Sequence, residues 1–340
     1  MTPRHRAWLL ALVTTALLGG ATVYGVVAFA GAQQRSAAPS AVDTVADTAT
    51  DAPHAGQRIV FRNTASGAGY GLVASVQRDD PAGTRELTSV ACDRVYATMS
   101  AGMCLHIDRD VVTTFRATLT DANWNEIRSL PLPGIPSRTR ISADSRLVSS
   151  TAFITGESYA TVGFSTQTVI SGVDGTEYGS LEDFALLVNG EPVSAIDRNV
   201  WGVTFADDDT VFYATAASAG QTWLVRGDLT ARTLTAIKDT AECPSLSPDG
   251  AHIAYKKNTG TISQPYWGIA VLDFATGIET ILPEESNVDD QVEWLDNDTL
   301  LYGMQNTATV GDSTVWSIPI DGTSAPRVFI EHAWSPSVVR

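Results

Sequence analysis

Six regularly spaced hairpin signals constrain the fold of this chain more than any other feature. Each is a β-type run, a turn that contains an aspartate, and a second β-type run. The turn aspartates are Asp80, Asp121, Asp174, Asp228, Asp273 and Asp321. Neighbouring aspartates lie between 41 residues (80 to 121) and 54 residues (174 to 228) apart. A repeat of this length, built from short strands and turns, is typical of β-propellers. The chain is therefore predicted to be all-β, with six blades of four strands.

A second series of turns lies between the first ones. Its clearest member is CPSLSPDGAHIAYKKN, residues 243–258, in which a Pro-Asp-Gly turn separates two β-type runs. Pro248 fixes the backbone for a tight turn, and Gly250 accepts a positive φ at no steric cost. Degenerate copies begin at Ser142, Phe205 and Trp294, and a truncated copy, WSPS, begins at Trp334. These turns are predicted to join the first and second strands of successive blades.

The two ends of the repeat region complement each other. It begins with runs that match the second, third and fourth strands of a blade, starting with RIVFRN at 58–63. It ends with EHAWSPS, from Glu331, which matches a first strand with nothing after it. Pairing the two would close the ring and remove an exposed sheet edge. We therefore expect residues 329–335 to pair with 58–63.

The segment LSPDGAHIAYK at 246–256, followed by the LDFATGIETIL hairpin at 272–282, resembles the TolB-type WD40-like (PD40) repeat family. The resemblance covers most of 58–340 and is closest at 243–284. This family forms six-bladed propellers, and the resemblance implies the same fold for this chain. An apolar N-terminal segment stands where TolB itself has an extra domain.

Two segments of different composition precede the repeats. Residues 7–30 are uncharged and largely apolar, and Arg4 and Arg6 flank them. Such a run is long enough to cross a bilayer as a helix, with the positive flank inside. We therefore expect a cytoplasmic N-terminus at 1–6, a transmembrane signal anchor at 7–30, a flexible Ala/Thr/Asp-rich stalk at 31–56, and an extracellular or periplasmic propeller at 57–340. Cleavage after Ala28-Phe29-Ala30 is the alternative, with the same location.

The three cysteines fit an exported domain. Cys92 and Cys104 lie 12 residues apart around a predicted hairpin, and outside the cytoplasm such a pair tends to be oxidised. We predict a disulfide between them, with two buried thiols as the alternative. The chain-entropy model gives it a stabilisation of roughly 3 kcal/mol. Cys243 is predicted to be a buried free thiol.

Signals for catalysis, metals and nucleic acids are weak. The net charge of −16 repels phosphate backbones, so we expect no nucleic-acid partner. His106, His252 and His332 lack the spacing of metal ligands. The nearest match to a serine-hydrolase elbow, residues 156–160, lacks the final glycine. We therefore expect no metal, no cofactor and no catalytic residue.

The long connections of the repeat are predicted to gather on one rim of the propeller, and long loops on a rigid scaffold are where binding residues concentrate. The candidate binding residues are Tyr70, Arg138, Arg140, Asp197, Arg198, Trp201, Tyr266, Trp267, Asp289, Asp290 and His332. Charges mixed with aromatic rings favour a non-enzymatic, membrane-tethered platform that binds a protein, a peptide or another ligand. The alternative is an enzyme that acts on a glycan or lactone in the central channel, which for a glycan needs two facing carboxylates.

Overall fold

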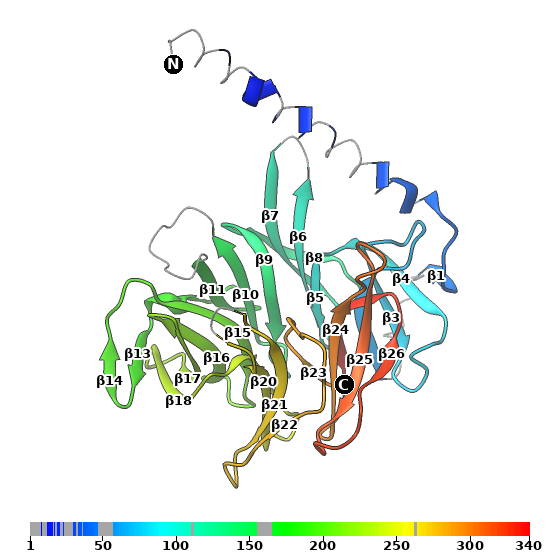
Figure 1. Cartoon of the computed structure of the whole chain (residues 1–340). Helices are drawn as coiled ribbons and strands as arrows, with labels where there is room; N and C mark the ends of the chain where they lie inside the picture. Colours follow the sequence, from blue (N-terminus) through cyan, green and yellow to red (C-terminus); the bar gives the residue numbers. More distant parts are fainter. Residues whose placement is uncertain are drawn as a thin grey trace.

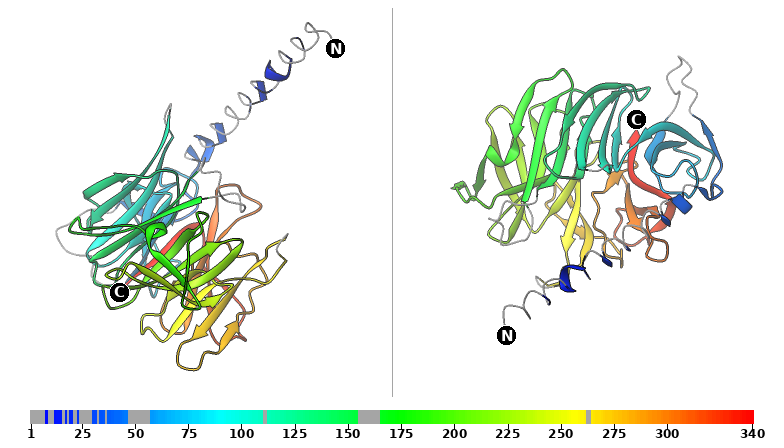
Figure 2. Two further views of the ribbon diagram at one scale, coloured as in Figure 1. Left: turned by 90° about the vertical axis from the view of Figure 1, so that its left-hand side faces the viewer. Right: turned by 90° about the horizontal axis from the view of Figure 1, so that it is seen from above.

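The computed structural model describes residues 37–46 and 57–340, apart from 110–111, 155–164 and 262–263, together with scattered residues between 8 and 35. Six sheets stand around a common axis (Figure 1 and Figure 2). Four of them have four strands, and blades 1 and 4 carry additional outer strands. The predicted six-bladed, all-β propeller is confirmed.

From the central axis outwards, blade 1 contains β27 (Ala333–Val339), β2 (Arg58–Asn63), β3 (Leu72–Gln77), β4 (Arg85–Ala91) and β1 (Thr44–Ala46); blade 2 contains β5 (Arg94–Ala97), β6 (Ala101–Arg109), β7 (Thr113–Asp121) and β8 (Glu126–Pro131); blade 3 contains β9 (Ile135–Ile141), β10 (Leu147–Ile154), β11 (Ser165–Gly172) and β12 (Glu177–Ser180). In the same order, blade 4 contains β15 (Asn199–Phe205), β16 (Val211–Ser218), β17 (Gln221–Asp228), β18 (Thr233–Asp239), β13 (Ala185–Val188) and β14 (Glu191–Val193); blade 5 contains β19 (Glu242–Leu246), β20 (His252–Asn258), β21 (Trp267–Asp273) and β22 (Glu279–Ile281); blade 6 contains β23 (Glu293–Trp294), β24 (Thr299–Gln305), β25 (Ser313–Pro319) and β26 (Arg327–Ile330). A short 3-10 helix, η1 (Leu181–Asp183), follows β12.

Blade 1 joins the two ends of the domain. β27 pairs antiparallel with β2, which places Arg58 opposite Val339 and Asn63 opposite Ala333. Figure 2 shows this red strand beside the blue strands of the N-terminal half. Closure between the ends is confirmed, but the predicted segment is only partly right, because the pairing strand is 333–339 and overlaps the predicted 329–335 only at 333–335.

The error in the closing segment comes from the WSPS motif. The sequence predicts a turn there, but WSPS lies inside β27. Ser335 has a φ of 57°, and Cys243, in the ECPS segment of β19, has a φ of 50°. Both strands bulge at this point of their pairing with the next strand. WSPS therefore corresponds to ECPS, four residues before the turn that it was expected to match.

The predicted transmembrane helix at 7–30 is wrong. Across the part of the chain that the structure describes, no helix is both long and apolar enough to cross a membrane. A crossing needs about 20 consecutive apolar residues in one helix. Much of the segment, like residues 1–6, lies outside the described residues.

Part of the segment predicted to be a stalk, 31–56, lies on the propeller. β1 pairs in parallel with β4 and gives blade 1 a fifth strand. The Arg35 guanidinium lies 5.4 Å from the centre of the Tyr70 ring, and the Arg35 carbonyl accepts the backbone N–H of Gly67. Residues 47–56 lie outside the described residues.

Neighbouring blades pack face to face through apolar side chains. Between blades 5 and 6, for example, the buried side chains of Ile269, Trp294 and Tyr302 belong to one cluster. Because each blade lies between two others, both faces of its strands are apolar, as the sequence runs indicate. This packing makes the ring a rigid support for the inner strands.

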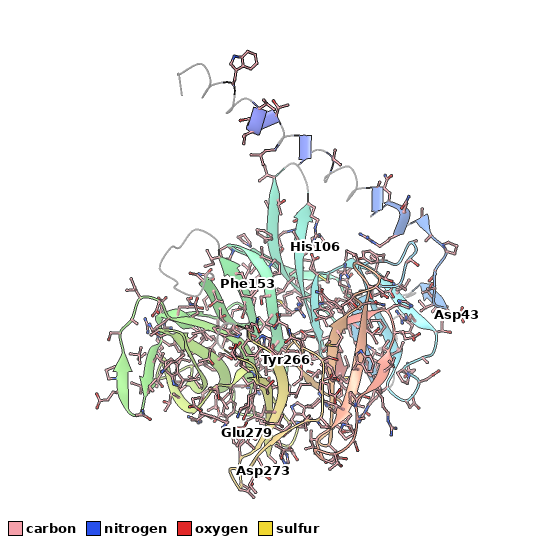
Figure 3. All side chains as sticks on the ribbon, viewed as in Figure 1. Asp43, His106, Phe153, Tyr266, Asp273 and Glu279 are labelled. Carbon is pink, nitrogen blue, oxygen red and sulfur yellow. A yellow bond between two sulfur atoms is a disulfide. The ribbon has the colours of Figure 1, made fainter. Side chains whose placement is uncertain are left out.

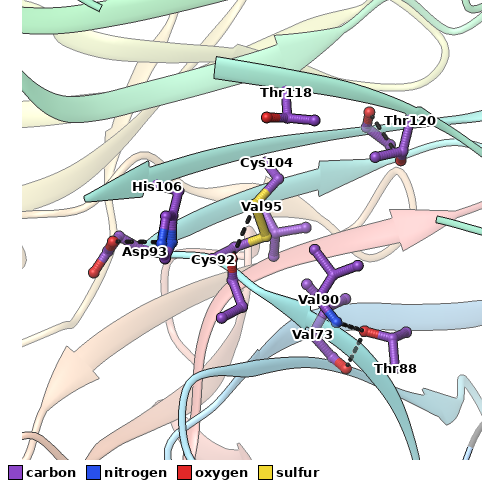
Figure 4. Close-up of a disulfide and its surroundings, with 12 residues drawn as sticks. Val73, Thr88, Val90, Cys92, Asp93, Val95, Cys104, His106, Thr118 and Thr120 are labelled. Atoms are coloured by element: carbon purple, nitrogen blue, oxygen red, sulfur yellow. Dashed lines mark hydrogen bonds and ion pairs between the residues drawn. A yellow bond between two sulfur atoms is a disulfide. The ribbon is translucent and has the colours of Figure 1, made fainter. Parts of the chain in front are cut away.

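The predicted disulfide between Cys92 and Cys104 is confirmed (Figure 4). It joins the segment before β5 to β6, next to buried Val73 and Val95. Cys243 is a buried free thiol. The disulfide therefore fixes the point at which the chain enters the inner strand of blade 2.

Candidate binding site

The inner strands β27, β5, β9, β15, β19 and β23 surround the axis, each in contact with its neighbours in the ring. β15 and β19 approach each other closely at Gly202. A Cβ on Gly202 would lie 2.7 Å from the Cα of Cys243, and Gly202 has a φ of 68°. Only glycine accepts both the conformation and the approach. The channel between these strands is therefore narrow, and single side chains can span it.

One ion pair does span the central channel. Arg140, on β9 of blade 3, pairs with Glu293 on β23 of blade 6, the blade opposite, and both side chains are buried. The guanidinium also donates to the Val292 carbonyl at 2.6 Å and to the Ser245 hydroxyl at 3.3 Å. We call Arg140 and Glu293 the axial ion pair. It blocks the channel at this level.

Other blades contribute to the axial ion pair. The Arg140 guanidinium lies 4.7 Å from the centre of the Tyr96 ring of β5. Glu293 accepts the backbone N–H of Val338 in β27 at 3.3 Å, and Arg340 lies 3.6 Å from its carboxylate. Burial acts to lower the pKa of Arg140, but the Glu293 carboxylate and Tyr96 together outweigh it and raise that pKa above its ordinary value. The contacts come from five blades and keep the arginine charged.

A cavity of about 1500 Å³ lies on one side of the axial ion pair. Its walls come from the N-terminal ends of inner strands, from residues 283–287, and from the ends of β10, β20, β21 and β24. Phe153 at the end of β10 lines it, and Tyr266 lies just before β21 at its edge (Figure 3). Because the axial pair blocks the channel below, the cavity is a blind funnel. We call it the funnel.

Two cations in the funnel each have a carboxylate and an aromatic ring. Arg94 pairs with buried Asp290 at 2.8 Å, and its guanidinium lies 4.6 Å from the centre of the Trp334 ring. Lys256 pairs with Asp289, and its ammonium lies 4.5 Å from the centre of the Trp267 ring. Each cation therefore covers one face of a tryptophan that would otherwise be open to a ligand.

A second carboxylate, Glu242, lies 4.0 Å from the Lys256 ammonium. Burial raises the pKa of Glu242 above its ordinary value, against the attraction of Lys256. Burial acts on Asp289 in the same direction, but Lys256, together with Arg138 and Arg94, outweighs it and holds the pKa of Asp289 below its usual range. Two carboxyls on one ammonium thus differ in their tendency to hold a proton.

Arg138 is the third cation of the funnel and is paired less well. Its nearest carboxylate oxygen belongs to Asp289, at 4.0 Å, and the same oxygen is held by Lys256. Its guanidinium donates to the Ser137 carbonyl at 3.0 Å and to the Asp289 carbonyl at 3.4 Å. Its Nε is buried and has no hydrogen-bond partner. The side chain is nevertheless only 11% exposed.

The structure brings together a subset of the predicted binding residues. Those that line the funnel are Arg138, Trp201, Trp267 and Asp289. Asp290 lies beneath it as the partner of Arg94, and Arg140 lies deeper, in the axial ion pair. Tyr266, 42% exposed, donates from its hydroxyl to the Glu285 carbonyl at the funnel edge.

The remaining predicted residues have other roles. The Tyr70 ring lies between Arg35 and Arg62, and its hydroxyl donates to the Gly311 carbonyl. Asp197 accepts from the Ser218 hydroxyl, and Arg198 donates to the Phe184 carbonyl. His332 contacts Asp312 at 2.9 Å. None of these four lines the funnel.

Sequence reasoning missed Arg94, Glu242, Lys256 and Trp334, which also line the funnel. For Arg94 a signal was available in the strand register: it lies two residues before Tyr96, as Arg138 lies two residues before Arg140, and Tyr96 and Arg140 are in contact. This signal does not extend to Glu242, Lys256 or Trp334. Over the residues that the structure describes, no three His, Cys, Asp or Glu side chains gather as metal ligands.

Comparison with solved structures shows the same fold. TolB from Acinetobacter baumannii is 16% identical, with 85% of this chain and 67% of that chain covered and a TM-score of 0.57. A chain of a nidogen/laminin complex is 9% identical, with 84% and 99% covered and a TM-score of 0.55. This chain has a propeller fold like that of TolB. No family model matches the sequence, and the search of curated proteins found no match either.

Proposed function

We propose that this chain is a non-enzymatic binding platform that works outside the cytoplasm and takes a segment of a protein or peptide partner into the funnel. The observation that carries the proposal is the blind cavity of about 1500 Å³ at one mouth of a channel that the axial ion pair blocks. A ligand can enter this space and cannot pass through it. The Cys92–Cys104 disulfide supports an oxidising compartment.

The funnel wall has the composition of a recognition surface. Trp201, Trp267, Trp316 and Trp334 line it, together with amide and hydroxyl groups from Asn287, Gln305, Asn306, Thr307 and Thr314. Large aromatic side chains beside polar groups and arginine are enriched where proteins bind partners. These side chains project from a rigid ring, so a ligand meets a preformed site.

Site-specific photo-crosslinking tests this proposal. A photoreactive phenylalanine at Asn287, inside the funnel wall, is expected to give one dominant adduct in cells that express the full chain. The same residue at Thr323, in an exposed turn that does not line the funnel, is the matched control. Equal adducts from both positions, or none from Asn287, would contradict the proposal.

A second candidate function is supported by the pair of carboxyls on Lys256. Glu242 and Asp289 both line the funnel, and their pKa values are displaced in opposite directions. Two carboxyls that differ in their affinity for a proton are one requirement of acid–base hydrolysis of a glycan. Release of reducing ends from an oligosaccharide panel, abolished by Glu242→Gln, would establish it. No release from any member would leave the binding role alone.

A further inference from the structure

The charged groups of the funnel point to one feature of its ligand. Arg94 has Asp290 at 2.8 Å, and Lys256 has Asp289 in direct contact. Arg138 alone among the three cations of the lining has no carboxylate closer than 4.0 Å, and that carboxylate is already engaged by Lys256. The geometric pairing within the funnel is therefore incomplete at one guanidinium. Burial acts to lower the pKa of Arg138, but Cys243, Asp290 and Asp289 together raise it above its ordinary value, so nearby negative groups favour the charge although no carboxylate is in direct contact with it.

The incomplete pairing has an energetic consequence. A guanidinium that is largely removed from water loses hydration, and a carboxylate in bidentate contact is the partner that best replaces it. Arg138 instead donates to two backbone carbonyls and to the Ser137 hydroxyl, and its Nε has no hydrogen-bond partner. Neutral acceptors compensate a buried charge less well than a carboxylate does. An incoming anion would complete the site.

The neighbouring Asp289 restricts what kind of anion fits. Its side chain is 71% exposed, and only one of its oxygens is engaged by Lys256. A bare anion next to Arg138 would be repelled by this carboxylate, whereas a group that carries an N–H beside its own carboxylate could donate to it. A polypeptide has this arrangement at an aspartate or glutamate side chain and at its C-terminus.

We propose that the ligand of the funnel docks a polypeptide carboxylate against Arg138 while an adjacent N–H of the ligand donates to Asp289. This inference rests on the proposed binding function and specifies its ligand chemistry. Arg138 is a binding residue in this account, and Arg94 and Lys256 hold the surrounding acidic groups in place.

Three small probes distinguish the sources of the anion when titrated into the full chain by calorimetry. N-acetyl-aspartate amide carries a side-chain carboxylate beside an N–H, N-acetylglycine carries a terminal one, and inorganic phosphate carries no N–H. We expect saturable millimolar binding of at least one carboxylate and weaker binding of phosphate. Stronger binding of phosphate than of both carboxylates would overturn the role given to Asp289 and the polypeptide source.

The variant Arg138→Gln is expected to weaken carboxylate binding at least tenfold. Arg138→Lys should have an intermediate effect, because lysine keeps the positive charge but lacks the two parallel N–H donors of a guanidinium. Arg226→Gln, an exposed arginine on β17, is the matched control and should bind as the wild type does. An unchanged melting temperature in Arg138→Gln separates lost binding from lost folding, and Arg138→Lys serves if that variant is unstable.

Unchanged affinity in Arg138→Gln, or no binding of either carboxylate to the wild type, would overturn the inference. Photo-crosslinking from Asn287 separates this failure from a failure of the binding function. Suppose that Arg138→Gln leaves carboxylate affinity unchanged but still gives the adduct from Asn287. The funnel then binds a partner through contacts other than Arg138. If the adduct is also absent, the binding function itself fails.

Discussion

Arg138 and Arg140 lie two residues apart on the same inner strand, yet their surroundings differ in kind. Arg140 meets the Glu293 carboxylate, the Val292 carbonyl, the Ser245 hydroxyl and the Tyr96 ring. Arg138 meets backbone carbonyls and a shared carboxylate at 4.0 Å. The period of two places both on one face of β9, so the difference arises from what the opposite blades provide.

The fold supplies a carboxylate partner in direct contact with Arg140, but it supplies none in direct contact with Arg138. Breaking a buried pair leaves an uncompensated charge, which destabilises a protein by about 3–5 kcal/mol. Arg138 lies at a cavity wall and bonds mainly to carbonyl oxygens, so we expect it to contribute less to stability than the axial ion pair does. We therefore assign the axial ion pair to the structure and the Arg138 region to binding.

Removing residues 333–340 is expected to have the largest effect. It deletes β27, which completes blade 1, and it removes the contacts of Val338 and Arg340 with Glu293. An open ring exposes an unpaired edge, so we expect loss of cooperative unfolding and aggregation on size-exclusion chromatography. Arg340→Ala, which keeps β27, should remain folded. A truncated chain with the melting temperature of the intact one would show that neither closure nor the axial pair depends on β27.

Removing the disulfide is expected to have an intermediate effect. Cys92 precedes β5, the strand that carries Arg94 to the funnel and Tyr96 to the axial ion pair. The double variant Cys92→Ala/Cys104→Ala should lose roughly 3 kcal/mol of unfolding free energy in urea. Alkylation of the unreduced native protein should leave both residues unlabelled; labelling of both would contradict a formed disulfide.

The smallest effect is expected at Glu242, where burial raises the pKa of the carboxyl. A folded-state pKa above the unfolded one gives a contribution that is complete below the unfolded pKa and is lost as pH rises through the folded pKa. Glu242→Gln should therefore raise the melting temperature by about 1–3 °C at pH 7 and change it little near pH 4. A lower melting temperature at pH 7 would mean that Lys256 needs this carboxylate.

The fold could be predicted from the sequence because its turns are determined by residues that are close together in the chain. Five of the six turn aspartates accept backbone N–H groups of their own hairpins. Asp273, for example, accepts those of Ala275 and Thr276, and Asp321 accepts those of Thr323 and Ser324. Such turns depend on residues two or three positions away, so they are visible without tertiary information.

The site was less accessible because it depends on contacts between blades. Arg94 and Asp290 are 196 residues apart in the chain, and Arg140 and Glu293 are 153 apart. No local pattern marks such pairs. Tyr70 and His332 were selected as loop residues on the correct rim, but their contacts with Gly311 and Asp312 hold neighbouring segments together instead. The position of a residue on a rim predicts that its side chain is exposed, but it does not predict that this side chain meets others at one site.

Double-mutant cycles on the two pairs distinguish the structural role of Arg140 from the binding role of Arg138. One cycle uses Arg140→Gln and Glu293→Gln, the other uses Arg138→Gln and Asp289→Asn, and both are measured by urea denaturation. We expect a coupling of about 2–3 kcal/mol for the axial ion pair and less than about 0.5 kcal/mol for Arg138 with Asp289. Couplings of equal size would contradict the division between a structural pair and an arginine kept for a ligand.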